Sequence, residues 1–319
     1  MGNSVLRVSD LGKTFHAGGM FKAIGKDKQA VADVSFNLNT GETLAIVGES
    51  GSGKSTTARL VMRLLSVSSG HVFWNDDDVT ALSARALRPL RGHIQMVFQD
   101  PFASLNPRMK IWQSVAEGLR VHQPELSRSA RRERVAETLA LCGLDESGMD
   151  RYPHQFSGGQ RQRIGIARAL VVEPKVLVLD EPVSALDVSV QAQILNLLKD
   201  IQTRKGLAYL FISHDLSVVR HIADQISVMF AGRVVEQGKA TDVFASPQHP
   251  YTQALLQARP IDHPSERSDV GIKQAAEECV AESGCAFLPR CPYAQSDCVD
   301  FDNRLREQAY ACLHPLNLP

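Results

Sequence analysis

The chain has 319 residues, which suits about two domains and leaves enough apolar surface for a substantial core. Apolar residues make up 44% and charged residues 22%, so disordered and fibrous classes are excluded. The 35 basic and 35 acidic side chains cancel, and this neutral balance argues against a protein that binds nucleic acid mainly through its phosphates.

Targeting and membrane signals are missing from the sequence. No apolar run approaches the ~18 residues that cross a bilayer, and residues 1–20 lack the apolar core of a secretion signal. We therefore expect a soluble, intracellular protein. Its six cysteines, five of them after residue 278, are not expected to form a disulfide framework, because the cytosol keeps thiols reduced.

Short apolar runs predict strands along the chain. Residues 43–47 form a run that leads into glycines, and residues 54–65 carry a helical pattern. Residues 176–179 form a second run that stops at an acidic pair, and residues 207–212 form a third that stops at polar residues. Apolar strands that end in polar residues, with helices between them, predict a parallel α/β sheet with its site at the carboxyl ends of the strands.

Two other regions differ from this pattern. Residues 107–157 are helical in pattern and rich in arginine, which predicts an inserted helical subdomain. After about residue 260 the chain becomes polar and then rich in cysteine, which predicts a separate small tail.

A phosphate-binding loop follows the first apolar strand. The segment fits G-x-x-x-x-G-K-[ST], and its glycines let the backbone curl so that several N–H groups face one anion. Lys54 is expected to reach the β- and γ-phosphates of a nucleotide and Ser55 to ligate Mg²⁺. The residues of this candidate ATP site are Gly48, Glu49, Ser50, Gly51, Ser52, Gly53, Lys54, Ser55 and Thr56.

Further motifs accompany the loop. They are Gln99, the run Phe156–Arg163, the strand and acidic pair Val176–Pro182, the tetrapeptide Ser184–Asp187, and His214. In this order and spacing they resemble the Q-loop, signature motif, Walker B, D-loop and switch histidine of ABC-type ATPases, over about residues 5–260. The resemblance implies an α/β fold: a RecA-like P-loop NTPase core with a mixed sheet, an inserted ABC helical subdomain and a small Cys-rich C-terminal tail. It implies an ATP-binding domain at 1–262, with the helical subdomain at about 100–160, and an extension at 263–319.

The acidic pair and its neighbours have a chemical interpretation. Glu181 ends a buried strand, where it can polarise a water for in-line attack on the γ-phosphate. Asp180 is expected to hold Mg²⁺ through water, together with Ser55 and Gln99. The resemblance makes His214 the residue that fixes the attacking water, although a histidine in such a place can also be a structural hydrogen bonder. It also makes Gln99 the link between the site and the helical subdomain.

The signature residues open a helix and offer a second set of N–H groups to an anion. These residues are Ser157, Gly158, Gly159 and Gln160. The family geometry implies that they close on ATP bound to a second ATPase subunit. Asp187 belongs to the motif that resembles the D-loop. Phe15 lies where the family places its adenine-stacking aromatic, and an ordinary strand aromatic is the alternative.

Two segments, 98–109 and 247–256, resemble the dipeptide/oligopeptide-permease branch of the family, and an insertion at about 17–28 is similar to its second, "F-type" ATPase. The tail has the spacing C-x5-C-x6-C-x13-C, formed by Cys285, Cys291, Cys298 and Cys312. In that branch such cysteines can hold a [4Fe–4S] cluster, while zinc and unmetallated thiols are alternatives. Residues 273–283 are predicted to form a polar helix, and Cys142 and Cys279 to be ordinary thiols.

The resemblance implies an ATP-hydrolysing subunit of an ABC importer for di-/oligopeptides or related solutes. Its expected partners are a second identical or homologous ATPase subunit, two transmembrane permease subunits and, indirectly, an extracytoplasmic solute-binding protein, without nucleic acid. Its expected place is the cytoplasmic face of the inner membrane, as a peripheral protein. A non-transport ABC ATPase acting on nucleic acid or ribosomes is the alternative. A regulatory module without hydrolysis would be expected to lack Glu181 or His214, and both are present.

Overall fold

The computed structural model describes residues 3–16, 27–100, 104–257, 281, 283–305 and 309–317. Most of the predicted insertion at 17–28, most of the predicted polar helix at 273–283, and Cys279 lie outside these residues. The boundary predicted at 262/263 lies outside them too.

A six-stranded sheet forms the centre of the molecule, in the order β10-β9-β3-β8-β7-β6. The strands are β3 (Thr43–Val47), β6 (Ile94–Val97), β7 (Val176–Asp180), β8 (Ala208–Ser213), β9 (Gln225–Phe230) and β10 (Arg233–Lys239). Five of them run parallel, and only β10 pairs antiparallel, with β9. Because β3, β7 and β8 are buried at every residue, they have the continuous apolar sequences that predicted them.

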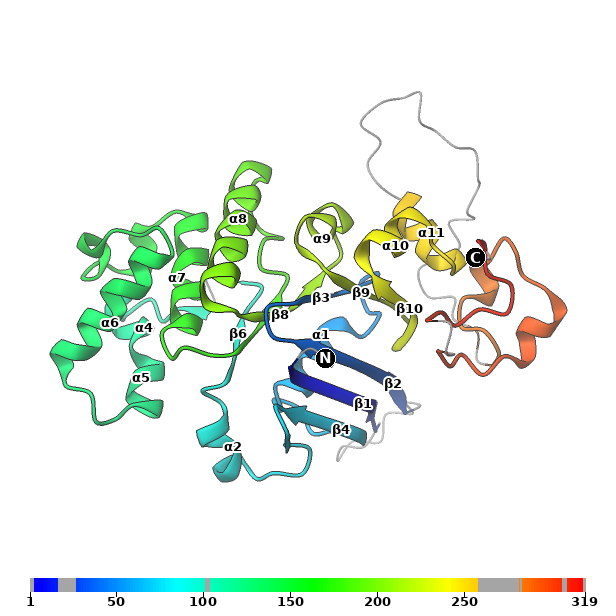
Figure 1. Ribbon diagram of the computed structural model, residues 1–319, viewed down its shortest axis with the longest axis horizontal. Coiled ribbons are helices and arrows are strands. Elements are labelled where there is room, and N and C mark those ends of the chain that lie inside the picture. Colours follow the sequence, from blue (N-terminus) through cyan, green and yellow to red (C-terminus); the bar gives the residue numbers. More distant parts are fainter. Residues whose placement is uncertain are drawn as a thin grey trace, which may run out of the picture.

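A second, antiparallel sheet lies beside the first, in the order β2-β1-β4-β5. Its strands are β1 (Ser4–Phe15), β2 (Lys28–Asn39), β4 (Ser69–Trp74) and β5 (Asp77–Asp78). Helix α1 (Lys54–Val61) shares one apolar cluster with residues of both sheets, and the indole Nε1 of Trp74 donates to the Val61 carbonyl at 3.0 Å. The helix that follows the phosphate loop is thus held between two sheets (Figure 1).

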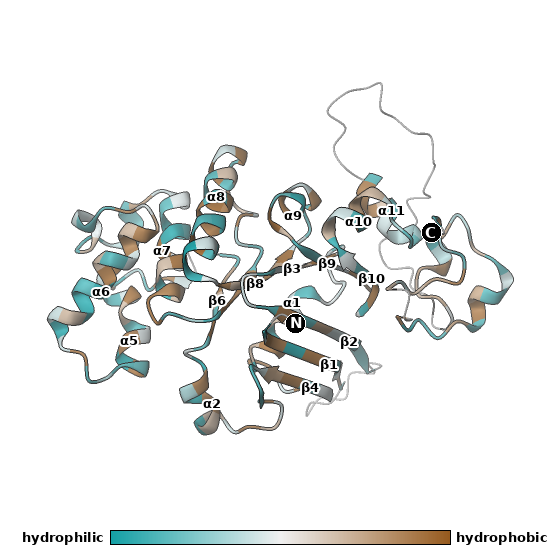
Figure 2. Cartoon of the chain, in the orientation of Figure 1, coloured by the Kyte–Doolittle hydropathy of each residue, from teal (hydrophilic) through white to brown (hydrophobic). Residues whose placement is uncertain are grey.

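The helical subdomain lies at the β6 edge of the central sheet (Figure 1). It contains α4 (Ile111–Val115), α5 (Glu117–His122) and α6 (Arg128–Leu141), within the predicted range, and α7 (Gly158–Leu170) packs against all three. The other helices are α2 (Ala84–Leu90), α8 (Val188–Lys205), α9 (Leu216–Ile222), α10 (Ala240–Ala245) and α11 (Pro250–Gln257). In Figure 2 the outer helices alternate teal and brown, since each buries one face. No described helix is long and apolar enough to span a membrane.

The described part of the C-terminal extension packs on the central core. Phe287 is 1% exposed and its ring lies 5.4 Å from that of Phe230 and 5.5 Å from that of Tyr251. Residues 309–311 run along β10, where Gln237 N–H donates to the Ala309 carbonyl at 2.8 Å. Two short 3₁₀ helices, η4 (Leu288–Arg290) and η5 (Ser296–Asp300), lie between these two contacts in the chain. The extension thus shares the core of the ATP-binding region at its β10 edge (Figure 1).

Candidate functional site

The phosphate loop connects β3 to α1 and presses against the backbone of two other strands. Gly48 and Gly53 have φ of +150° and +105°, values that side-chain-bearing residues rarely adopt. A Cβ atom at Gly48 would collide with the carbonyl of Met229, and one at Gly53 with the carbonyl of Ala30. Glycine is therefore required at both positions, and the loop is held between β2 and β9.

The Lys54 ammonium lies inside this loop. It donates to the carbonyls of Gly48 at 2.8 Å and Glu49 at 2.7 Å, and the residue is 5% exposed. Burial lowers the pKa of Lys54, while the carboxylates of Glu181, Asp180 and Glu49 oppose the shift. A buried ammonium held by loop carbonyls can exchange them for the oxygens of a polyanion such as a triphosphate.

The other predicted residues of the phosphate loop are Ser50, Gly51, Ser52 and Thr56. Ser52 is buried, its N–H donates to the Glu49 carbonyl at 3.2 Å, and its carbonyl accepts from Gly232 N–H at 2.9 Å. Ser50 and Gly51 form the turn of the loop, and Thr56 lies on α1.

Oxygen ligands suited to Mg²⁺ meet at the start of α1. The Ser55 hydroxyl donates to Oδ1 of Asp180 at 3.0 Å, and Asp180 is 5% exposed at the end of β7. Burial raises the pKa of Asp180, while the hydrogen bond from Ser55 lowers it and the charge of Glu181 raises it further. A hydroxyl beside a buried carboxylate offers two oxygen ligands of the kind that Mg²⁺ prefers.

Two predicted residues, Gln99 and His214, contact the carboxylate of a third, Glu181. Gln99 Nε2 donates to Oε2 of Glu181 at 2.8 Å, and His214 Nδ1 lies 3.0 Å from Oε1. They follow the adjacent strands β6, β7 and β8, whose carboxyl ends meet at one edge of the sheet. Glu181 has a φ of +47°, and its N–H donates to the Ile212 carbonyl at 3.0 Å. A strained backbone thus holds this carboxylate between Gln99 and His214.

The signature residues lie elsewhere. Ser157 caps α7: its hydroxyl accepts from Gln160 N–H at 3.3 Å, and the Gln160 side chain accepts from Ser157 N–H at 3.0 Å. A Cβ atom at Gly159 would collide with Val190 of α8, so the signature packs beside Asp187, the N-cap of α8. Helix α7 contacts β6, which is three strands from β3 in the sheet, about 14 Å away at the usual strand spacing. In Figure 1 α7 lies apart from α1, so the two motifs do not meet within one chain.

Phe15 ends β1 on the side of the phosphate loop. It pairs with Lys28, two residues from Ala30, whose carbonyl faces Gly53. Its side chain is 43% exposed, which leaves a ring face accessible to a planar ligand. The ammonium of Lys13 lies 5.3 Å from the ring centroid.

The four cysteines of the extension line one cavity of about 20 Å³. Burial raises the pKa of the Cys285, Cys291 and Cys312 thiols, in the last case to about 11. Within the part of the chain described, no three of the four sulfurs lie within 4.8 Å of one another. Sulfurs around a single zinc ion lie about 3.8 Å apart, since Zn–S bonds are about 2.3 Å long. Four thiols are a donor set of the kind that holds either zinc or an iron–sulfur cluster.

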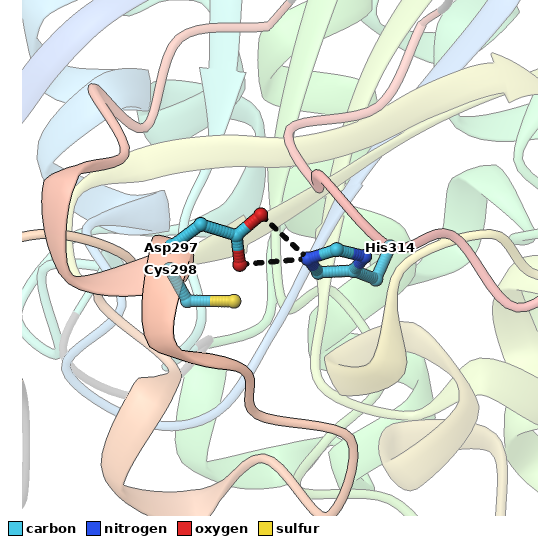
Figure 3. A group of neighbouring side chains, drawn as sticks. All are labelled: Asp297, Cys298 and His314. Atoms are coloured by element: carbon cyan, nitrogen blue, oxygen red, sulfur yellow. Dashed lines mark hydrogen bonds and ion pairs between the residues drawn. The ribbon is translucent and has the colours of Figure 1, made fainter.

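His314, which lines the same cavity, pairs with the carboxylate of Asp297. Nε2 of His314 lies 2.8 and 3.0 Å from the two oxygens of Asp297, and the Cys298 sulfur lies beside the pair (Figure 3). Neither His314 nor Asp297 belongs to a motif that was predicted from the sequence. Cys142, predicted to be an ordinary thiol, is fully buried and burial raises its pKa to about 12.

Two contacts with the phosphate loop were also missed. The Tyr251 hydroxyl accepts from Glu49 N–H at 2.9 Å, and Arg290 pairs with the Glu49 carboxylate. Tyr251 lies in the segment 247–256 that resembles the permease branch, so a local signal existed for it. Nothing near Arg290 in the sequence indicates a contact with a loop 241 residues away.

Comparisons with known proteins agree with this geometry. Residues 31–184 match the family model "ABC transporter", and residues 235–298 match "Oligopeptide/dipeptide transporter, C-terminal region". The chain is 44% identical to the oligopeptide transport ATP-binding protein OppF of Haemophilus influenzae, over 98% of this chain and 97% of that protein. It is 48% identical to OppF of Escherichia coli, over 86% and 83% of the two chains.

Solved structures of ABC cassettes share the fold. The cbiO1 protein of Clostridium perfringens, part of an ABC transporter complex, superposes with a TM-score of 0.67 at 33% identity, covering 76% of this chain and 91% of that one. The ATP-binding cassette MJ0796, solved as a dimer bound to ADP and Pi, gives 0.66 at 30% identity, covering 74% and 98%. The chain belongs to the ABC transporter family, as an ATP-hydrolysing subunit of the branch that carries the oligopeptide/dipeptide transporter C-terminal region.

Proposed function

We propose that this subunit binds MgATP at its phosphate loop and hydrolyses it with Glu181 as general base, to energise import of di- or oligopeptides. The observation that carries the proposal is the convergence of Gln99 and His214 on the Glu181 carboxylate, at the strand edge that also holds Ser55 and Asp180. Mg²⁺, held by Ser55, Gln99 and Asp180, would neutralise charge on the β- and γ-phosphates.

Glu181 then polarises the attacking water, and His214 orients both this carboxylate and the water. Lys54 leaves the loop carbonyls of Gly48 and Glu49 for the β- and γ-phosphates, which replace them as its ligands. The position of Phe15 supports a role in stacking on adenine. The loop residues Gly48 to Thr56 supply N–H groups to the phosphates.

The complete site requires a second ATPase subunit, identical or homologous. Since Ser157, Gly158, Gly159 and Gln160 lie apart from the phosphate loop of their own chain, they are proposed to bind the nucleotide of the partner subunit. Val188, which follows Asp187, is 82% exposed, and an apolar side chain so placed suits a contact that forms when the subunits close.

The transport assignment is supported by the extension and by the relatives. Oligopeptide transport is the function in the names of the relatives from H. influenzae and E. coli. We infer two transmembrane permease subunits as partners, an extracytoplasmic solute-binding protein as an indirect one, and a peripheral place on the cytoplasmic face of the inner membrane. The nature of the peptides is set by those partners, and related solutes fit the same ATPase.

The test of this function is ATP hydrolysis by the complex reconstituted with its permease subunits in lipid. Peptide-loaded solute-binding protein should stimulate hydrolysis severalfold, and unloaded binding protein should not. Stimulation by nucleic acid or ribosomes instead would favour the alternative of a non-transport ATPase, which the balanced charge of the chain disfavours.

We further propose that Cys285, Cys291, Cys298 and Cys312 hold a [4Fe–4S] cluster. Support comes from four thiols on one buried cavity, at a spacing wider than that of a zinc site. The Asp297–His314 pair lies beside Cys298 and would supply a hydrogen bond or a substitute ligand there. The cluster would join η4, η5 and the chain end near residue 312, and so stabilise an extension with little regular structure.

A further inference from the structure

A partly buried ion pair joins the C-terminal extension to the phosphate loop. Arg290 Nη1 donates to Oε2 of Glu49 at 2.8 Å and Nη2 donates to Oε1 at 2.7 Å. The Arg290 side chain is 12% exposed and that of Glu49 36%. Two parallel bonds between a planar guanidinium and a carboxylate fix the direction of both side chains.

The backbone of Glu49 also makes several hydrogen bonds within and around the phosphate loop. Its N–H donates to the Tyr251 hydroxyl at 2.9 Å, and its carbonyl accepts from Lys54 Nζ at 2.7 Å and from Ser52 N–H at 3.2 Å. A shift of Glu49 would therefore move the backbone that forms the phosphate cradle and change the contacts of Lys54.

Arg290 in turn is positioned by the extension. Its guanidinium lies 5.5 Å from the ring centroid of Phe287 and 5.7 Å from that of Phe230, both of which are buried. Its N–H donates to the Phe287 carbonyl at 3.0 Å, and it immediately precedes Cys291. The fold of the segment that carries the cysteines therefore sets the position of Arg290.

The pair also changes the charge next to the nucleotide. A triphosphate brings several negative charges to a loop that carries the Glu49 carboxylate. Without a partner, that carboxylate would repel the phosphates at a distance where a partly buried pair is poorly screened. Arg290 neutralises it.

We propose that Arg290 is a positioning residue for ATP binding, which acts through Glu49 to hold the phosphate loop in shape and to cancel its carboxylate charge. This inference rests on the proposed function, because it takes the loop as the ATP site. It makes the extension and the ATP site energetically coupled, so the state of the Cys-lined segment affects ATP affinity through Arg290.

A double-mutant cycle tests the proposal. The dissociation constant of a non-hydrolysable ATP analogue is measured on the full chain for Arg290→Ala, Glu49→Gln and the double variant. We expect Arg290→Ala to weaken binding at least about fivefold, a typical coupling between sites. In the Glu49→Gln background the same change should have little effect, since no carboxylate remains to be neutralised. Arg290→Lys should give an intermediate value, because it keeps the charge but not the two-bond geometry.

Controls separate positioning from general damage. Arg304→Ala removes an exposed arginine of the same extension and should leave affinity unchanged. In the assembled ATPase, Arg290→Ala should raise the KM for ATP and leave kcat within about twofold, since it acts on binding. Wild-type affinity in Arg290→Ala, or an equal loss with and without the Glu49 carboxylate, would overturn the proposal. Absence of analogue binding by the wild-type chain would instead contradict the proposed function.

Discussion

Nδ1 of His214 lies 3.0 Å from Oε1 of Glu181, while Gln99 donates to the other oxygen of the same carboxylate. Both oxygens of Glu181 are thus engaged by side chains from neighbouring strands. The carboxylate is held at the end of β7, beside the Asp180 that would hold Mg²⁺.

Replacement of this base should separate binding from hydrolysis. Glu181→Gln is expected to keep ATP binding and to lower turnover by about 10²- to 10⁴-fold, because the amide cannot accept the proton of the water. The variant should accumulate as an ATP-bound dimer, visible by light scattering. Near-normal hydrolysis in the assembled transporter would show that another residue is the base.

Removal of Phe287 should weaken the attachment of the extension. The ring is 1% exposed and packs on Phe230 and Tyr251, so Phe287→Ala should lower the free energy of unfolding by about 3–5 kcal/mol. Val299 is 48% exposed in the same segment, and Val299→Ala should change the free energy of unfolding by less than about 0.5 kcal/mol. If chemical denaturation gave equally small changes for Phe287→Ala and Val299→Ala, the extension would not share the core.

The metal content of the extension can be measured directly. Protein purified without oxygen should contain about four iron atoms per chain and be brown, as a cluster with four thiolate ligands requires. Cys291→Ser should abolish both properties, while Cys142→Ser should leave iron content unchanged because Cys142 lies in the core away from the cavity. One zinc per chain without iron would assign the site to zinc.

The free energy of unfolding should depend on pH through His249, which is buried where the C-terminal extension packs on the core. This side chain is 1% exposed, and burial lowers its pKa from 6.5 to about 4. Between these values the unfolded chain binds a proton that the folded chain does not, so stability falls as the pH falls. The loss amounts to about 3 kcal/mol between pH 6.5 and pH 4.

His249→Asn isolates this contribution. The amide oxygen can accept from Tyr251 N–H, as Nδ1 does now at 3.0 Å, but it does not titrate. The neighbouring Glu236 has a pKa raised by burial and therefore acts in the opposite direction, but it is common to both proteins and cancels in their difference. Urea unfolding of the two proteins at several pH values should converge toward pH 4, and parallel curves would contradict the assignment.

The central strands of the fold, and the residues at their ends, could be predicted from the sequence. Buried parallel strands need continuous apolar runs, so β3, β7 and β8 were visible, and their polar ends located Glu181 and His214. The antiparallel sheet of β1, β2 and β4 was not predicted. Its long strands contain bulges that interrupt the simple alternation of apolar and polar residues.

The contacts between the extension and the core could not be predicted from local sequence patterns. The cysteine spacing predicted a common site, which stays a prediction; the four cysteines line one cavity. The packing of Phe287 into the core and the pairing of Arg290 with Glu49 depend on tertiary structure, since no periodicity relates residues 241 positions apart. For that reason the tail was expected to be a separate unit, whereas its described residues share the core.

The shared nucleotide site is the central claim, and one pair of variants tests it most directly. ATP affinity of the isolated subunit and ATPase rate of the assembled complex are compared for Ser157→Arg and Lys54→Ala. We predict that Ser157→Arg leaves affinity within about twofold and lowers the ATPase rate about 10²-fold or more, because the arginine blocks closure on the ATP of the partner subunit. Lys54→Ala should weaken affinity directly, since Lys54 lies inside the loop that is proposed to bind the phosphates. A loss of affinity in Ser157→Arg as large as that in Lys54→Ala would place both motifs on one nucleotide and contradict the shared site.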